Sequence, residues 1–151
     1  MTDAPVTVTP GEGIAVVGPQ LAALVRAGPD DTVVRRLWAV VRSEGAFADA
    51  VSALGVEGFA TLPDLVITGA DGRVRRVLVR GETWAEVHGD GPVQVLSGRG
   101  VHTWVEHTVA DGADVVLRLD RPGITATPAD GGFELDRGLT PAAPVTLAGG
   151  D

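Results

Sequence analysis

The fold is decided by residues 65–96, which read LVITGADGRVRRVLVRGETWAEVHGDGPVQVL. The apolar runs of this stretch are separated by Asp71-Gly72 and by Asp90-Gly91. Asp-Gly pairs between apolar runs favour hairpin turns, because such turns need the left-handed backbone that these residues tolerate. Gly81 lies within the central run and allows a bend there. We therefore predict consecutive antiparallel hairpins over this stretch, with a bend at Gly81.

Further apolar runs on either side predict more strands. Residues 14–17 and 21–25 are short runs, and each is followed by a Gly-Pro pair. Residues 115–119 form another run, before Pro122-Gly123. A last hairpin is possible between residues 124–127 and 132–135.

Residues 101–109 fit two alternatives. A short helix would align one set of side chains on one side: Val101, Trp104, Val105 and Thr108. A strand would align another set on one face: Val101, Thr103, Val105 and His107. We favour the helix, which would bury Trp104, and the strand remains the open alternative.

The clearest helical pattern begins after residue 30. Asp30 or Asp31 supplies an N-cap oxygen, and apolar residues then recur at helical spacing up to Gly45, a plausible stop. A second helical piece spans residues 47–54, and Gly55 is expected to close it. Segregated strands and helices joined by short turns are typical of α+β proteins.

We therefore predict an α+β fold, a mainly antiparallel sheet with one helical segment, about residues 31–54, packed on a face. Residues 1–138 are expected to form a single domain. Residues 139–151, rich in Pro, Ala and Gly, are expected to be a flexible tail or linker that adds little stability. The predicted core contains Ile14, Val16, Leu24, Val33, Leu37, Val40, Val51, Leu54, Leu65, Ile67, Val77, Val79, Val95, Val116 and Leu119.

The composition excludes several kinds of chemistry. The 151 residues contain no cysteine, so disulfides, thiolate zinc sites and cysteine nucleophiles are absent. All 12 basic residues are arginine, and without lysine there is no Walker A loop and no Schiff-base chemistry. The absence of lysine, tyrosine and asparagine is the bias that a GC-rich bacterial genome would leave.

Charge and hydropathy limit the classes of partner that the chain is expected to bind. The net charge is −8, whereas nucleic-acid binders usually carry a basic stripe, so no nucleic-acid partner is expected. No run approaches the ~20 apolar residues of a membrane helix. The first ten residues also lack the features of a signal peptide, so we expect a cytoplasmic protein with no membrane partner.

No motif predicts a catalytic or metal site. His102 and His107 are five residues apart and match no spaced ligand motif, so we expect no metal and no cofactor. Ser97 lacks the preceding glycine of a nucleophile elbow. The chain is therefore expected not to be an enzyme. The alternative is a small or degenerate hydrolase that uses Ser97 and His102, since such sites are assembled in space rather than in sequence.

A partner-binding surface is predicted around Trp84. If residues 82–88 form a strand, Trp84 shares its face with Glu82, Glu86 and His88, and this charged face should be partly exposed. Tryptophan is enriched at interface hot spots, so Trp84 is a candidate anchor for a protein partner. The open alternative is that its ring lies flat over a sheet edge, covered by an arginine stem such as that of Arg76 or Arg80. Three arginines complete the candidate contact set, namely Arg76, Arg80 and Arg99.

Two short motifs give the chain a family resemblance. Leu96-Ser97-Gly98-Arg99 and Thr103-Trp104-Val105-Glu106, with the strand residues before them, make residues 11–120 resemble the N-terminal domain of a group of actinobacterial forkhead-associated (FHA) proteins. In that family the domain precedes a zinc-ribbon-like segment and a phosphothreonine-reading FHA domain.

The resemblance implies a regulatory or scaffolding interaction module beside Ser/Thr phosphorylation signalling, without enzymatic activity. This chain contains neither a CxxC segment nor an FHA domain, so phosphothreonine recognition is assigned to none of its residues. It is expected to be either a fragment of a longer FHA-containing protein or a stand-alone relative.

Overall fold

The structure is a computed structural model, and it describes residues 6–8, 13–58, 61–101, 103–110, 112–119, 133–134, 138–142 and 145–147. Its elements follow in the order β1 (Val6–Val8), β2 (Gly13–Val17), β3 (Leu21–Val25), α1 (Thr32–Arg42), α2 (Phe47–Glu57), β4 (Leu65–Asp71), β5 (Val74–His88), β6 (Gln94–Gly98), β7 (Val105–Val109), β8 (Asp114–Arg118), β9 (Phe133–Glu134), β10 (Gly138–Ala142) and β11 (Val145–Leu147). The described strand pairs are all antiparallel. The α+β class and the antiparallel sheet are therefore confirmed.

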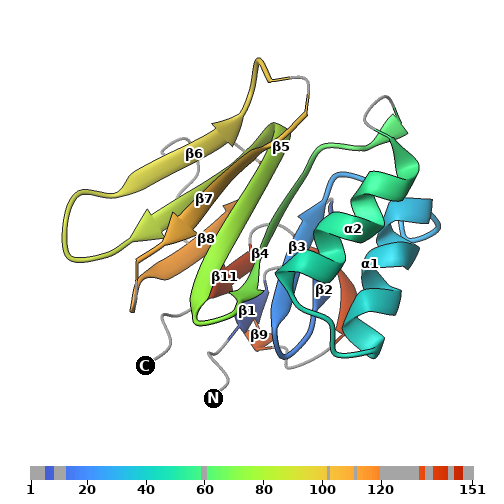
Figure 1. The fold of residues 1–151 in the computed structure, drawn as a ribbon, viewed down its shortest axis with the longest axis horizontal. Helices are drawn as coiled ribbons and strands as arrows, with labels where there is room; N and C mark the ends of the chain where they lie inside the picture. Colours follow the sequence, from blue (N-terminus) through green and yellow to red (C-terminus); the bar gives the residue numbers. More distant parts are fainter. Residues whose placement is uncertain are drawn as a thin grey trace.

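The long strand β5 joins two halves of a curled sheet (Figure 1). Its first part pairs with β4 and β7, and its last part pairs with β6 and β8. The first half-sheet has the order β10-β2-β3-β4-β5-β7, and the second half-sheet has the order β6-β5-β8-β11-β1-β9. The chain changes from one half to the other at residues 81–84, where the register with β6 shifts.

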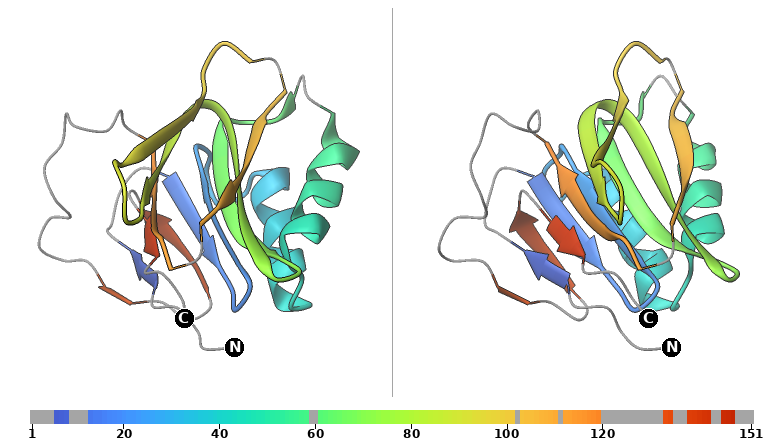
Figure 2. Two further views of the ribbon diagram at one scale, coloured as in Figure 1. Left: turned by 60° about the vertical axis from the view of Figure 1, so that its left-hand side comes forward. Right: turned by 90° about the vertical axis from the view of Figure 1, so that its left-hand side faces the viewer.

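The two half-sheets and the helices form three layers (Figure 2). Along β2, Ala15 and Val17 lie in the core between the half-sheets, together with Leu117 of the second half-sheet. The alternate residues Ile14 and Val16 lie in the core shared with the helices. Since both faces of β2 and β3 are buried, these two strands consist of continuous apolar runs.

The predicted helical segment is two helices that pack against β2, β3 and β4. The Asp31 side chain caps α1, because its Oδ1 accepts a hydrogen bond from the Val33 N–H at 2.8 Å. The turn between the helices places Glu44 at a φ of 58°, and Gly45 follows it. The prediction that Gly55 ends the second helix is wrong, because α2 continues to Glu57 and Gly58 takes the positive φ.

Most of the predicted core is confirmed. Val40 and Val51 are half-buried against the helix-side core, and Val95 is 52% exposed, so its assignment to the core is wrong. Val95 pairs with Glu86 on the face of the second half-sheet that points away from the first. The remaining twelve are buried: Ile14, Val16, Leu24, Val33, Leu37, Leu54, Leu65, Ile67, Val77, Val79, Val116 and Leu119.

Two further predictions about the chain's second half are corrected. Residues 105–109 form a strand, because their backbone pairs with residues 75–79 of β5, and the favoured helix is wrong. The flexible tail is wrong for residues 139–142 and 145–147. The first of these segments pairs with β2, and the second lies between β8 and β1. Residues 124–127, the first strand of the predicted last hairpin, lie outside the described residues.

Candidate functional site

The bend of β5 is held by a polar corner that fixes the direction of the residues after it. Gly81 has a φ of 72°. The Asp64 carboxylate accepts a hydrogen bond from the Glu82 N–H at 3.1 Å. Arg26 reaches across the same corner, and its guanidinium donates to the carbonyl oxygens of Glu82 at 2.6 Å and Leu119 at 2.5 Å. These contacts fix the direction in which the last part of β5 enters the second half-sheet.

We expect Gly81→Ala to destabilise the fold by at least about 2 kcal/mol. A methyl group there would overlap the Asp64 carboxylate, and alanine would also be strained at this positive φ. The measurement is the free energy of unfolding by urea. Gly72→Ala is the matched control, since Gly72 has a φ of 66° with nothing within 4 Å of the added Cβ. Equal losses for the two variants would contradict a role for the corner.

The face of the second half-sheet that points away from the first is the candidate site, and we call it the outer face. Ala85 and Val87 of β5 lie in the core between the half-sheets, so the alternate residues Trp84, Glu86 and His88 lie on the outer face. Cross-strand neighbours on the same face are Ser97 and Val95 of β6, and Arg118 and Val116 of β8. The predicted common face is confirmed for Trp84, Glu86 and His88, but the register shift between Gly81 and Trp84 interrupts the strand alternation on which the placement of Glu82 depended. The expected exposure of the charged face is wrong for Glu86, which is buried.

A buried carboxylate lies at the centre of the outer face. The Glu86 side chain is 11% exposed, and its Oε2 accepts a hydrogen bond from Nε of Arg118, whose side chain is 13% exposed. The other oxygen, Oε1, lies 3.0 Å from Nε2 of His88. Glu86 and Arg118 are 32 residues apart in the sequence, so no local motif signals this pair. Because both carboxylate oxygens already have partners, the cluster is a satisfied ion pair rather than an open ion site.

Among the described residues of the outer face, no nucleophile lies beside a base. Ser97 pairs with Trp84, and His88 lies four residues farther along β5, which is about 13 Å at strand spacing. The Ser97 hydroxyl instead accepts a hydrogen bond from the Arg99 N–H at 3.1 Å. His102, the other member of the alternative hydrolase pair, lies outside the described residues, so that alternative stays a prediction. Within the described ranges, no group of three or more His, Cys, Asp or Glu residues could hold a metal ion.

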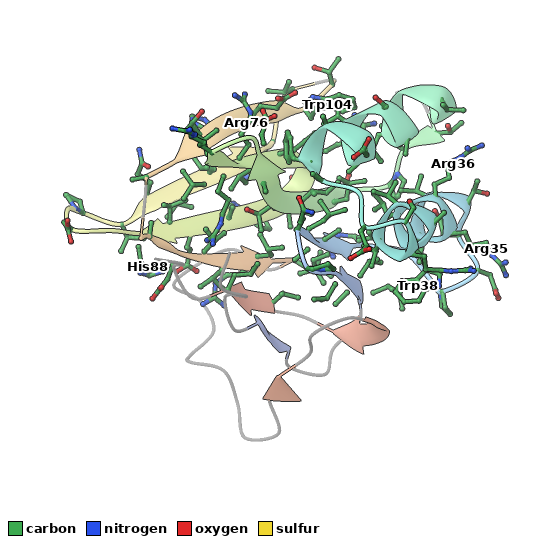
Figure 3. The ribbon with its side chains drawn as sticks, turned by 60° about the horizontal axis from the view of Figure 1, so that its bottom comes forward. Arg35, Arg36, Trp38, Arg76, His88 and Trp104 are labelled. Carbon is green, nitrogen blue, oxygen red and sulfur yellow. The ribbon has the colours of Figure 1, made fainter. Side chains whose placement is uncertain are left out.

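The hydrogen bonds and ion pairs described for the predicted arginines are with residues other than Trp84. Arg76 lies on the first half-sheet, where it bonds Glu106 at 3.2 Å and lies 3.8 Å from Asp71 (Figure 3). Arg80 donates to the Thr103 carbonyl at 2.7 Å, and Nε of Arg99 lies 3.2 Å from Glu82. Each arginine therefore has an intramolecular role.

Trp104 belongs to the first half-sheet, on the helix side. Its indole N–H donates to Glu106 at 2.9 Å, and the ring packs against the helix-side core while remaining half-buried. The expected full burial of Trp104 on a helix is wrong, because the residue precedes the edge strand β7 and has neighbours from the sheet on one side only.

Exposed valines adjoin the outer face, and sequence reasoning missed them. Val93, just before β6, is 49% exposed, and Val95 within it is 52% exposed. Val95 is flanked by Gln94 and Leu96 in an apolar run that is indistinguishable by composition from a buried strand. Only the position of β6 beside β5 shows that these valines face solvent.

Neither the described helices nor the comparisons with known proteins indicate what this site binds. The described helices include none that is long and apolar enough to cross a membrane. No protein-family model, curated protein or solved structure matches the chain.

Proposed function

We propose that the chain is a non-enzymatic interaction module that binds a protein partner through the outer face around Trp84. One observation carries the proposal. Trp84 is half-buried beside the exposed valines of β6, on a face that neither described helix covers (Figure 1). Exposed apolar side chains that adjoin one another on a surface mark interaction sites, and tryptophan is enriched among the residues that dominate binding energy.

The charges of this face favour recognition by apolar contact. Glu86 is bonded to Arg118 and His88, so the centre of the face presents a satisfied ion pair beside Trp84. A charge on the partner would therefore add little to the binding free energy there. Covering the indole ring and the valines would add more. We expect the partner to present an apolar patch with a polar rim.

The wider context is supported by the FHA-protein resemblance of residues 11–120. It suggests a cytoplasmic regulatory or scaffolding module beside Ser/Thr phosphorylation signalling in a GC-rich actinobacterium. The arginines first assigned to partner contact are given structural roles in this proposal, and Trp84 remains the anchor.

We expect Trp84→Ala to weaken partner binding by about 2 kcal/mol or more, about 30-fold in Kd, while the chain stays folded. The chain, coupled to a resin, would first retain a partner from an actinobacterial extract. That partner, purified, would then be titrated by calorimetry against the wild type and the variant.

Trp104→Ala is the matched control, because it removes a half-buried tryptophan from the first half-sheet. It should leave the Kd unchanged. Unaltered binding by Trp84→Ala would refute the proposal. So would a loss of about 3–5 kcal/mol in unfolding free energy, which would show that Trp84 is a core residue.

A further inference from the structure

The sheet has four strands with an unpaired side within the described residues, namely β6, β7, β9 and β10. Proteins usually protect such edges with charges, proline or very short strands, since the free backbone groups otherwise pair with another chain. β7 carries Glu106 and His107, both exposed. β10 contains Pro141, which has no N–H to offer, and β9 is two residues long. Three of the four edges are therefore protected.

The fourth edge, β6, has none of these protections. Its sequence, QVLSG, contains no charge and no proline. It also carries the exposed Val95, with Val93 just before it. Since the same sheet protects its other edges, the lack of protection on β6 distinguishes this strand as a pairing surface.

We propose that β6 pairs antiparallel with β6 of a second copy of this chain, which makes the second half-sheet continuous across a dimer. The strand carries no charge, so it can pair with its own copy without opposing like charges. Pro92 and Gly98 bound an uncharged stretch whose midpoint is Val95. A two-fold axis through Val95 places Val95 of both copies side by side on the outer face.

The same register accounts for the neighbours of Val95. Val93 of each copy comes opposite Ser97 of the other, and Ser97 is the small cross-strand neighbour of Trp84. Asp90 and Arg99 flank β6 beyond its two ends, so the two-fold axis brings Asp90 of each copy toward Arg99 of the other, where it would compete with the Glu82 that Arg99 contacts in its own chain. The segment from Asp90 to Arg99 has no net charge, so the overall charge of −8 is not concentrated at the contact.

The dimer is expected to dissociate in the micromolar range, because one short strand buries less area than a standard interface. The inference concerns contact between copies and does not depend on the separate protein partner proposed above. It is measured on the purified chain alone, whereas the Trp84→Ala titration needs the partner, so either proposal can fail while the other stands.

The test uses the absence of cysteine from the chain. Val95→Cys would place two thiols across the axis, where directly opposite Cβ atoms are about 4.5–5.5 Å apart, close enough for a disulfide after a small adjustment. We expect oxidation to convert most of this variant to a covalent dimer on non-reducing gels. Val56→Cys is the matched control, since Val56 is 67% exposed on α2, away from β6. It should stay largely monomeric.

Sedimentation equilibrium supplies a second measurement without cysteine. Val95→Lys places a charge on the edge and should weaken the dimer at least about tenfold, with an unchanged circular dichroism spectrum, because the side chain is already exposed. A wild-type chain that stays monomeric throughout the micromolar range would overturn the proposal. Equal cross-linking of Val95→Cys and Val56→Cys would overturn it as well.

Discussion

Truncation of the chain after residue 142 is expected to abolish cooperative folding. The deletion removes β11, which pairs with β8 on one side and β1 on the other. Val145 is fully buried and Leu147 is 7% exposed, and burying such side chains contributes about 1.5–3 kcal/mol each. The deletion would also expose Leu117 and leave the backbone of β8 unpaired on the side away from β5. These losses together approach the whole stability of a domain, about 5–15 kcal/mol.

Thermal unfolding followed by circular dichroism measures this effect. The control is removal of residues 148–151 alone, which leaves every described strand pair in place and should shift Tm by less than about 4 °C, or 1 kcal/mol at this chain length. Leu147→Ala should be intermediate, with a loss of about 2–3 kcal/mol. A truncated chain that unfolds cooperatively near the wild-type Tm would show that β11 is dispensable, as a flexible tail would be.

Glu86→Ala is expected to reduce the free energy of unfolding by about 3 kcal/mol, because it leaves the Arg118 guanidinium in a largely buried position without its carboxylate. Arg118→Ala should cost a similar amount by leaving Glu86 uncompensated. The double variant should cost clearly less than the sum of the two, since no isolated charge then remains. Urea denaturation of the four proteins gives the coupling energy directly.

An exposed ion pair supplies the control for this cycle. Asp30 and Arg35 lie 3.3 Å apart with side chains 94% and 69% exposed. Asp30→Ala should cost less than about 1 kcal/mol, as is usual for solvent-exposed pairs. If Glu86→Ala cost no more than Asp30→Ala, the carboxylate would not hold the outer face together.

Several features of the fold follow from residues that are close in the sequence. Asp31 caps the helix that begins beside it, and the apolar spacing of the following residues gives its buried side. The hairpin between β4 and β5 forms where the Asp-Gly pair predicts it, although its central residues are Gly72 and Arg73. Gly at the first central position fits a type II′ turn, because only that residue then needs a positive φ. Local backbone preference is sufficient for such features.

The contacts of the candidate site join residues that are distant in the sequence. That Trp84, Glu86 and His88 share a face follows from the alternation of a strand. The bond between Glu86 and Arg118 depends on β8 lying beside β5, and nothing in either segment alone signals it. Val95 resembles a core residue by composition, and it is exposed because no described strand pairs with the other side of β6.

The sequence by itself determined the α+β class, the hairpins around Gly81 and the helices after Asp31, since these depend on hydrophobic period, turn residues and caps. Only the tertiary structure decided that residues 145–147 belong to the core and that residues 105–109 form a strand. A Pro-, Ala- and Gly-rich segment has weak local preferences, and it becomes ordered where β8 and β1 leave a place for Val145 and Leu147. Burial is a property of neighbours in space, and one of these neighbours, β1, comes from the opposite end of the chain.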